Sequence, residues 1–495
     1  MIYFVDKLGG TAELNSVSSL LGVHCFNFSK EMKYKMDYIY LNELYGKEKD
    51  YLGKRIKLKG WIRNHRKQKD FGFIQFSDGT CFKQLQLVYD NQLKNFEEIQ
   101  KFHICSAIEV EGELIESAGQ GQDYELKVSN IVLHGDCPED YPIQPKRHSM
   151  EFLREQSYLR LRTNTFQAVF RVRSVASMAI HQFFQERGYI YAHTPILTSS
   201  DCEGAGEMFQ VTTQNLDEIA KTGKVNNDDE YFGKLVGLTV SGQFEGEAFA
   251  QAFSKIYTFG PTFRADPSHT PLHIAEFWQI EPEVAFCDLE GIMDISEEMM
   301  KFVIKYTLEK CPDEFEFFDK FVEKGLIDKL NTVINSKFVR ATYKECIDIL
   351  KNAKVNFQFK PEYGEDLAKE HERYITEYFK CPVFITYWPQ NVKKCFYMKQ
   401  MDDGTVANAD LEMPGIGETY GMSQREDDFE KLEKRIEELG MNKDDYIWYM
   451  NLRKYGTTMH SGFGMGFERL IMYMTGISNI RDVSAFPRTP GNCLY

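Results

Sequence analysis

The fold of this chain is decided by residues 259–283, which read FGPTFRADPSHTPLHIAEFWQIEPE. Two hydrophobic, strand-like ends flank a polar loop, a pattern that predicts a hairpin. The loop holds Arg264, Asp266 and His273, and Phe277 begins the return strand. Arg264 can neutralise a phosphate and Phe277 can stack on a base. Taken alone, the stretch fits a surface hairpin that carries a solvated arginine somewhat better than a ligand site.

A glycine-dense stretch near the C-terminus, residues 461–470, reads SGFGMGFERL. Gly462 and Gly464 fit the start of a dinucleotide fingerprint, but Phe467 occupies the place of its third glycine. Alternate glycines instead predict a strand with one bare face, which a flat ligand can approach. Arg469 stands at the start of the helix predicted to follow. Tight packing of that helix on the strand is the alternative explanation for the glycines.

Residues 410–427, DLEMPGIGETYGMSQRED, combine acidic side chains with one arginine. The groups concerned are Asp410, Glu412, Glu418 and Arg425. Carboxylate oxygens are the ligands that a hard cation prefers, and a guanidinium suits a carboxylate or a carbonyl. A solvated acidic cluster is the alternative.

Two further segments place polar groups among small residues. They are residues 194–209, TPILTSSDCEGAGEMF, and residues 238–247, LTVSGQFEGE. Their side chains Glu203, Gln243 and Glu247 are candidates for recognising a small polar ligand.

The N-terminal part of the chain predicts a small β-barrel. Strands are expected over residues 55–63, 71–79, 81–90, 106–117 and 124–135, with a helical stretch over 91–102. The sequence Ser-Asp-Gly-Thr at 77–80 predicts a hairpin turn between the second and third strands. Five short strands with a helix between the third and fourth are the plan of an OB barrel. Residues 137–146 contain three prolines and predict a linker.

One stretch of this barrel is basic. Tyr51–Lys69 contains no acidic residue, and Phe71 and Phe73 follow it directly. Cations bind phosphates and aromatic rings stack on bases, so the segment favours binding of single-stranded nucleic acid. A solvated surface over core aromatics is the alternative.

Composition limits the class of protein. The 495 residues include 59 Lys and Arg against 74 Asp and Glu, a net charge of −15 that argues against nonspecific coating of nucleic acid. No apolar run reaches the ~18 residues that a membrane span needs, so no membrane partner is expected. The eleven cysteines form no C-x-x-C pair, which suits a reducing, cytoplasmic location. Residues 1–35 show no clear period and are predicted to be a dispensable N-terminal extension, with a short N-terminal arm of the folded protein as the alternative.

Taken in order, these segments resemble the class II aminoacyl-tRNA synthetases of the aspartyl/asparaginyl/lysyl subgroup, over roughly residues 40 to 495. The helix predicted over 163–188 and the following Pro195 resemble motif 1. Phe263-Arg264-Ala265-Asp266 with His273 and Phe277 resembles motif 2, and Gly462, Gly464, Gly466 and Arg469 match motif 3. Within the subgroup, SDCEGAGEMF, VSGQ, PGIGE, HSGFGMGFERL and FPRTPGN are most similar to the bacterial type of asparaginyl enzyme.

The resemblance implies an α+β fold: an N-terminal OB-fold barrel and a class II catalytic domain built on an antiparallel sheet flanked by helices. The expected boundaries are 1–35 for the extension, 36–137 for the anticodon-binding barrel, 138–155 for a linker, and 156–495 for the catalytic domain. A helical insertion is expected near 288–395. The implied partners are tRNA(Asn), ATP, L-asparagine and a second copy of the chain bound through the motif 1 helix.

The resemblance also implies site residues and a magnesium ion that accompanies ATP. Catalysis falls to Arg264, Glu418 and Arg469. ATP binding falls to Arg264, Asp266, His273, Phe277, Glu418, Gly464, Gly466 and Arg469. The amino acid is expected at Glu203, Gln243, Glu247 and Arg425. The metal is expected at Glu418 with Asp410, and the anticodon at Arg66, Phe73 and Gln86.

The amino acid can be argued from one position. Aspartyl enzymes of the subgroup carry a lysine three residues after the strand glutamine, where this chain has Gly246. A neutral amide needs an acceptor for its NH₂ and a donor for its oxygen, a pair that Glu247 and Arg425 are predicted to supply. Two positions depart from the motif 2 pattern: Asp266 stands in place of glutamate, and Leu272 stands where arginine is frequent.

Three other functions compete with this one. A synthetase-like ammonia ligase shares the catalytic core but lacks an anticodon barrel. A nondiscriminating aspartyl enzyme is disfavoured by the missing lysine. A noncatalytic RNA-binding paralogue is disfavoured because Arg264, Glu418 and Arg469 are all present.

Overall fold

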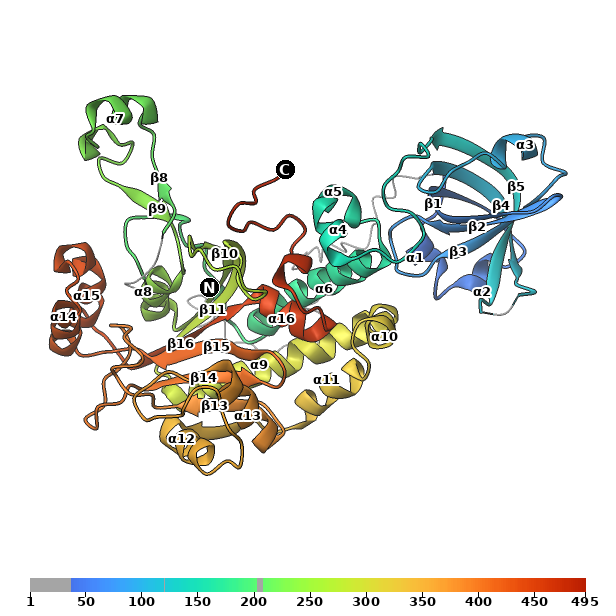
Figure 1. Cartoon of the computed structure of the whole chain (residues 1–495). Helices are drawn as coiled ribbons and strands as arrows, with labels where there is room; N and C mark the ends of the chain where they lie inside the picture. The colour runs from blue at the N-terminus through green and yellow to red at the C-terminus, as the bar shows by residue number, and fades with distance from the viewer. Residues whose placement is uncertain (1–36, 120, 203–207) are drawn as a thin grey trace, which may run out of the picture. The chain divides into compact units, whose positions relative to one another are not determined.

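The computed structural model describes residues 37–119, 121–202 and 208–495, which form two compact units that divide between Tyr141 and Pro142 (Figure 1). The extension predicted for residues 1–35 and the candidate residue Glu203 lie outside the described residues. Among the residues described, no helix is long and apolar enough to cross a membrane.

The first unit is a closed five-stranded barrel, which confirms the predicted OB fold. Its strands follow the order β1-β2-β3-β5-β4. Their bounds are Arg55–Lys67 for β1, Phe71–Ser77 for β2, Leu85–Asp90 for β3, Ala107–Glu116 for β4 and Tyr124–Gly135 for β5. Short helices accompany them: α1 (Leu41–Leu44), α2 (Glu48–Tyr51) and, between β3 and β4, α3 (Phe96–Ile99). Alternation along β1 buries Ile56, Leu58 and Ile62 in the barrel core.

The predicted turn between the second and third strands is longer than expected. Strand β3 begins at Leu85, four residues after the predicted start, so no tight hairpin forms at 77–80. The cause is the Asp78 carboxylate, which accepts hydrogen bonds from the backbone N–H of Leu41 at 2.6 Å and of Thr80 at 2.9 Å. The loop thus connects α1 to the barrel, a contact that local turn rules do not foresee.

The second unit is built on an eight-stranded mixed sheet with the order β12-β13-β14-β15-β16-β11-β10-β6. Pairing is antiparallel except at the two edges, where β12 pairs with β13 and β6 pairs with β10 in parallel. The bounds are Ile190–Tyr191 for β6, Lys255–Phe263 for β10, Glu276–Ala285 for β11, Val339–Thr342 for β12, Val383–Thr386 for β13, Asn408–Met413 for β14, Gly417–Gln424 for β15 and His460–Gly466 for β16. A separate small sheet holds β7 (Leu197–Thr198), β9 (Val236–Leu238) and β8 (Gln210–Val211).

Helices flank the large sheet, as the fold class predicts. The longest are α6 (Asn164–Glu186) and α9 (Leu289–Lys310), which pack on one another, and α9 also contacts β15 and β16. The others are α4 (Met150–Glu155), α5 (Ser157–Arg160), α7 (Leu216–Thr222), α8 (Gln243–Phe253), α10 (Pro312–Phe321), α11 (Leu326–Asn335), α12 (Tyr343–Lys351), α13 (Lys369–Phe379), α14 (Phe429–Glu438), α15 (Ile447–Lys454) and α16 (Phe467–Thr475). Short 3₁₀ turns lie at η2 (Asn227–Asp229), η3 (Lys443–Tyr446) and η4 (Ile480–Asp482). Residues 288–395, predicted as a helical insertion, hold α9 to α13 and also supply β12 and β13 to the sheet.

Candidate active site

A cleft of about 370 Å³ opens over the middle of the large sheet. Its floor is strand β11, on which Phe277, Gln279, Glu281 and Glu283 all line the cleft. Side chains two residues apart share one face of a strand, so the hairpin sequence itself places these four side by side. The cleft therefore has an aromatic end near Phe277 and an acidic end near Glu283.

The glycines of β16 make room for the side chains of β11. A Cβ atom added to Gly462 would lie 2.1 Å from Glu283 Oε1, and one added to Gly464 would lie 2.6 Å from Gln279 Nε2. At Gly466 an added Cβ would meet no atom of the described residues within 4 Å. Of the three positions, Gly466 thus leaves open space, whereas Gly462 and Gly464 admit neighbouring protein side chains.

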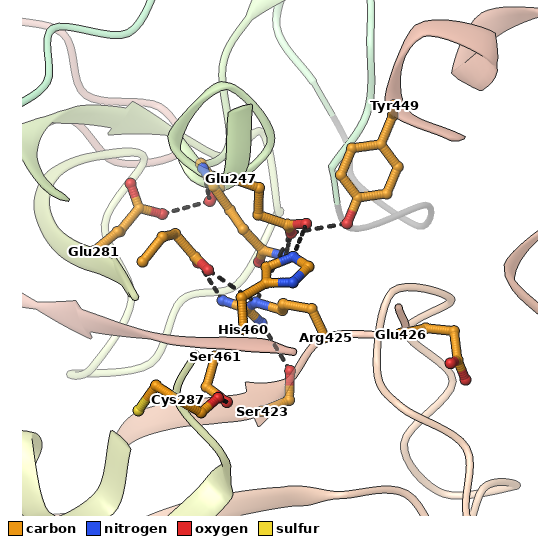
Figure 2. Close-up of polar contacts among 12 residues, drawn as sticks. Glu247, Glu281, Cys287, Ser423, Arg425, Glu426, Tyr449, His460 and Ser461 are labelled. Carbon is orange, nitrogen blue, oxygen red and sulfur yellow. Dashed lines mark hydrogen bonds and ion pairs between the residues drawn. The ribbon is translucent and has the colours of Figure 1, made fainter. Parts of the chain in front are cut away.

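A buried ion pair closes one end of the cleft. The Nε of Arg425 donates to Glu283 Oε2 at 3.2 Å, and its NH2 group makes a second hydrogen bond to the same carboxylate. The NH1 group of Arg425 donates to Ser423 Oγ at 2.7 Å (Figure 2). Glu283 is completely buried and Arg425 is 3% exposed. Burial raises the pKa of Glu283, and the charge of Arg425 opposes that shift.

Glu281, the neighbouring carboxylate on the same face, is held by three donors. They are the Ser241 hydroxyl, the backbone N–H of Gly242 at 2.9 Å and the Thr258 hydroxyl at 2.8 Å. This carboxylate therefore ties the N-terminal end of α8 to strands β10 and β11.

The opposite side of the cleft collects carboxylates around one lysine. Lys393 Nζ lies 2.6 Å from Asp410 Oδ2 and lines the cleft together with Glu418. Burial raises the pKa of Asp410 to about 6 and that of Glu372 to about 7, and it raises the pKa of Glu412 as well. Carboxylates outnumber cations here, so a further cation would be stabilised.

Comparisons with known proteins identify the family of both parts of the chain. A model of class II tRNA synthetases (D, K and N) matches residues 149–490, and one of OB-fold nucleic acid binding domains matches residues 56–133. The chain is 52% identical to the asparagine-tRNA ligase of Clostridium novyi over 460 residues, 92% of this chain and 99% of the relative. It is also 52% identical to the asparagine-tRNA ligase of Bacillus anthracis over 461 residues, with the same coverage. The chain belongs to the asparagine-tRNA ligase family.

Solved structures of the family have the same fold. The asparaginyl-tRNA synthetase of Pyrococcus horikoshii, complexed with asparaginyl-adenylate, superposes with a TM-score of 0.82 at 31% identity, covering 93% of this chain and all of that one. The enzyme of Entamoeba histolytica, also in complex with asparaginyl-adenylate, gives 0.77 at 26% identity, covering 90% and 97%.

Most of the family residues predicted from the sequence meet in the one cleft. Those that line it are Gln243, Arg264, Asp266, His273, Phe277, Asp410, Glu418, Arg425, Gly464, Gly466 and Arg469. Glu247 does not line it: its carboxylate is completely buried one helical turn below Gln243 on α8. The carboxylate that binds Arg425 in the cleft is Glu283, a residue that was not among those predicted from the sequence.

A usable signal for Glu283 was present in the sequence. Strand alternation from Phe277, already a predicted ligand contact, reaches Gln279, Glu281 and Glu283 in steps of two. Lys393 carried no comparable signal, because it lies in a loop and meets Asp410 only through the fold.

At the aromatic end, the motif side chains already contact one another. The Arg264 guanidinium lies 5.4 Å from the centre of the Phe277 ring. Arg469 NH1 donates to the Glu418 backbone oxygen at 2.8 Å. Burial, followed by the charge of Arg469, lowers the pKa of His273, so its imidazole is neutral near pH 7. Asp266 is exposed and accepts the Ser268 N–H within its own loop at 2.9 Å.

The three predicted anticodon residues also converge, on one outer face of the barrel. Arg66 NH2 donates to Gln86 Oε1 at 3.1 Å, and its guanidinium lies 5.1 Å from the Phe73 ring centre. Gln86 Nε2 in turn donates to Glu125 Oε2 at 3.0 Å. Trp61 and Phe71, both exposed, belong to the same two strands.

Proposed function

We propose that this chain joins L-asparagine to tRNA(Asn) at the expense of ATP, through an asparaginyl-adenylate. The observation that carries the proposal is the pair of Glu283 and Arg425 at the buried end of the cleft. A carboxylate accepts hydrogen bonds from an amide NH₂, and a guanidinium donates to an amide oxygen. Aspartate would place a second carboxylate against Glu283 and be repelled.

In the first step, an oxygen of the asparagine α-carboxylate attacks the α-phosphorus of ATP. A carboxylate–phosphorus bond forms, the bond to the bridging oxygen breaks, and pyrophosphate leaves with that electron pair. The nucleophile is already an anion, so the reaction requires no general base. The protein contributes position and charge neutralisation, as phosphoryl transfer generally requires.

The cleft residues suit these tasks. We assign the α-phosphate and the asparagine carboxylate to Arg264, and the two faces of adenine to Phe277 and Arg469. We assign the outer phosphates to His273 as a hydrogen-bonding group, and the α-amino group to Gln243. We also assign Gly464 and Gly466 to the nucleotide site: both line the cleft, Gly466 with open space above it and Gly464 beside the Gln279 side chain.

The family implies magnesium with ATP, and the acidic side of the cleft fits that ion. Within the described residues no three His, Cys, Asp or Glu side chains form a complete metal site. Mg²⁺ usually takes only one or two carboxylates and completes its shell with substrate phosphates and water. We propose Glu418 and Asp410 as those carboxylates. Asp410 pairs with Lys393, and the Glu412 Oε2 beside them is buried with no hydrogen-bond partner among the residues that the structure describes. When bound, the ion neutralises phosphate charge.

In the second step, the 3′ hydroxyl oxygen of the terminal adenosine of the tRNA attacks the adenylate carbonyl carbon. The bond from that carbon to the phosphate oxygen breaks, AMP leaves with the electron pair, and the hydroxyl proton passes to the phosphate or to water. We assign the anticodon to the barrel face of Arg66, Phe73 and Gln86, where stacking and hydrogen bonding are both available. We further propose a homodimer through α6 and a cytoplasmic location, which the scattered thiols favour.

The test is amino-acid-dependent pyrophosphate exchange with asparagine, aspartate and lysine side by side. Exchange with asparagine alone is expected. Equal exchange with aspartate would favour a nondiscriminating enzyme, and no exchange with any of the three would favour a noncatalytic RNA-binding role. Sedimentation of the full chain tests the dimer separately.

A further inference from the structure

Glu247 is a fully buried carboxylate that the proposed reaction does not use. Its Oε1 accepts Gln243 Nε2 at 2.9 Å and the Tyr449 hydroxyl at 2.7 Å. Its Oε2 lies 2.6 Å from Arg453 NH2 and 3.0 Å from His460 Nε2. Figure 2 shows the carboxylate between the His460 ring and the Tyr449 hydroxyl. Ionisation is maintained by these charged and polar neighbours, which lower the pKa of Glu247 despite its burial.

Two of these partners come from α15, a helix outside the central sheet. Tyr449 stacks on Phe244, the residue after Gln243, with ring centres 4.2 Å apart. The Arg453 guanidinium lies 4.1 Å from the Tyr449 ring centre, and its Nε donates to the Glu426 carbonyl at 2.8 Å. Arg453 thus connects α15 both to Glu247 and to the backbone directly after Arg425.

Charge balance links this cluster to the cleft. Arg425 stands between two buried carboxylates: its Nε is 3.2 Å from Glu283 Oε2 and 3.8 Å from Glu247 Oε1. Arg453 neutralises the Glu247 carboxylate. Arg425 can therefore keep both of its hydrogen bonds to the Glu283 carboxylate. Gln243 is fixed in the same way, since its NH₂ end is bound to Glu247 and its oxygen is left for another partner.

We infer that Arg453, Tyr449 and Glu247 form a positioning network that sets the selection of asparagine by holding Arg425 on Glu283 and Gln243 in one orientation. This inference rests on the proposed function, because it concerns how the same amino-acid site is held. None of the three touches substrate in this scheme. They act through Arg425 and Gln243.

The network makes a definite mechanical prediction. Without the Arg453 charge, Glu247 keeps its contact with His460 at 3.0 Å but loses its guanidinium partner, and Arg425, 3.8 Å away, is the nearest guanidinium that remains. Buried charges are strongly driven to find a partner, so Arg425 shifts toward Glu247 and away from Glu283. The asparagine end of the cleft loosens, whereas the ATP end, formed by Arg264, Phe277 and Arg469, keeps its contacts.

The first experiment compares Arg453→Met with Lys454→Met, its exposed neighbour on the same helix, in pyrophosphate exchange by the full chain. For Arg453→Met, the KM for asparagine should rise about tenfold or more, as expected for a lost charge-assisted hydrogen bond, and the preference over aspartate should fall. The KM for ATP should stay within about twofold, as for Lys454→Met, because no ATP contact is altered. Arg453→Lys, which keeps the charge, should recover much of the loss.

A double variant separates positioning from general damage. Adding Glu247→Gln to Arg453→Met removes the unbalanced charge, so the KM for asparagine should return toward the wild-type value. Equal increases in both KM values, or no recovery in the double variant, would overturn the network.

If Arg453→Met fails to fold, the asparagine KM of Tyr449→Phe tests the network instead. It deletes only the hydroxyl, and a rise of about threefold in the asparagine KM alone is expected from one lost hydrogen bond. An unchanged asparagine KM in Tyr449→Phe would count against the inference. Failure of the proposed function is seen separately, because the wild type itself would then not use asparagine.

Discussion

The cleft and the outer face of the barrel both gather cations, aromatic rings and polar groups, but they hold them differently. In the cleft, Glu283 is completely buried, Arg425 is 3% exposed, and each has fixed protein partners. On the barrel, Trp61 is 48% exposed and Phe71 is 43% exposed, and of the assigned residues only Gln86 is buried, at 7%. Arg66 there is held by a single side-chain hydrogen bond to Gln86 and by its contact with the Phe73 ring.

The cleft side chains are already held in place before a ligand binds, whereas the exposed side chains of the barrel are not. A pre-paired group loses little entropy on binding and is costly to disturb, whereas an exposed side chain is ordered by its ligand. Substitutions in the cleft should therefore have large, specific effects on chemistry, and those on the barrel should have moderate effects on RNA binding alone.

The largest expected effect is that of Arg264→Ala. Removing one phosphate-directed charge in a preorganised site typically costs on the order of a hundredfold or more in rate. Pyrophosphate exchange should nearly vanish while the thermal unfolding curve stays unchanged. Exchange within about threefold of wild type would remove Arg264 from the chemistry and weaken the contrast between the two regions.

Next in size is Glu283→Gln, with Glu276→Gln at the exposed start of the same strand as its control. The amide can donate to an aspartate carboxylate and no longer balances Arg425, so the preference for asparagine should fall about tenfold or more, from roughly 1–3 kcal/mol of lost pairing. Competition between the two amino acids in the exchange assay measures it. An unchanged ratio would mean that another group reads the amide.

The barrel counterpart is Phe73→Ala. A stacked base contributes roughly 1–3 kcal/mol, so the KM for tRNA should rise about tenfold. Adenylate formation does not involve the tRNA and should be untouched. Parallel loss of exchange and aminoacylation would show instead that Phe73 supports the barrel, and the predicted separation of the two regions would fail.

The smallest effect on activity is expected from His65, whose titration should change the stability of the barrel and not the chemistry. Burial lowers the pKa of His65 to about 4 from 6.5, and its Nε2 lies 2.7 Å from the Tyr89 hydroxyl. Between these values the unfolded chain binds a proton that the folded barrel does not, so barrel stability should fall as pH drops from about 6.5 to about 4.

Proteolysis on heating, with fragments mapped by mass spectrometry, can measure this pH dependence within residues 37–141. His65→Gln, which retains a polar partner for Tyr89, should flatten the slope. The same slope in both proteins would assign the titration to another group.

The sequence predicts the barrel more completely than it predicts the cleft. Alternation along β1 and β2 was sufficient for the barrel, because it depends on local pattern. The loop after β2 was not predicted correctly, since Asp78 binds Leu41, 37 residues away. In the cleft, strand periodicity could have identified Glu283, but nothing local distinguishes Glu247, four residues after Gln243 on α8, as buried.

The partners of Glu247 show why this part could not be predicted. Tyr449, Arg453 and His460 are more than 200 residues away in sequence and meet it only when α8, α15 and β16 are packed. A single sequence contains residue types at these positions, but the pairing of charges is a property of the folded core.

The close approach of Gly462 to Glu283 has a consequence for the design of altered enzymes. Because any side chain at position 462 would occupy the space of the Glu283 carboxylate, the two positions are not independent variables. A library that varies residue 283 alone would sample only pockets of one shape. Shortening residue 283 while enlarging residue 462 would move the wall of the pocket from one strand to its neighbour, and amino acids of a different outline become accessible targets.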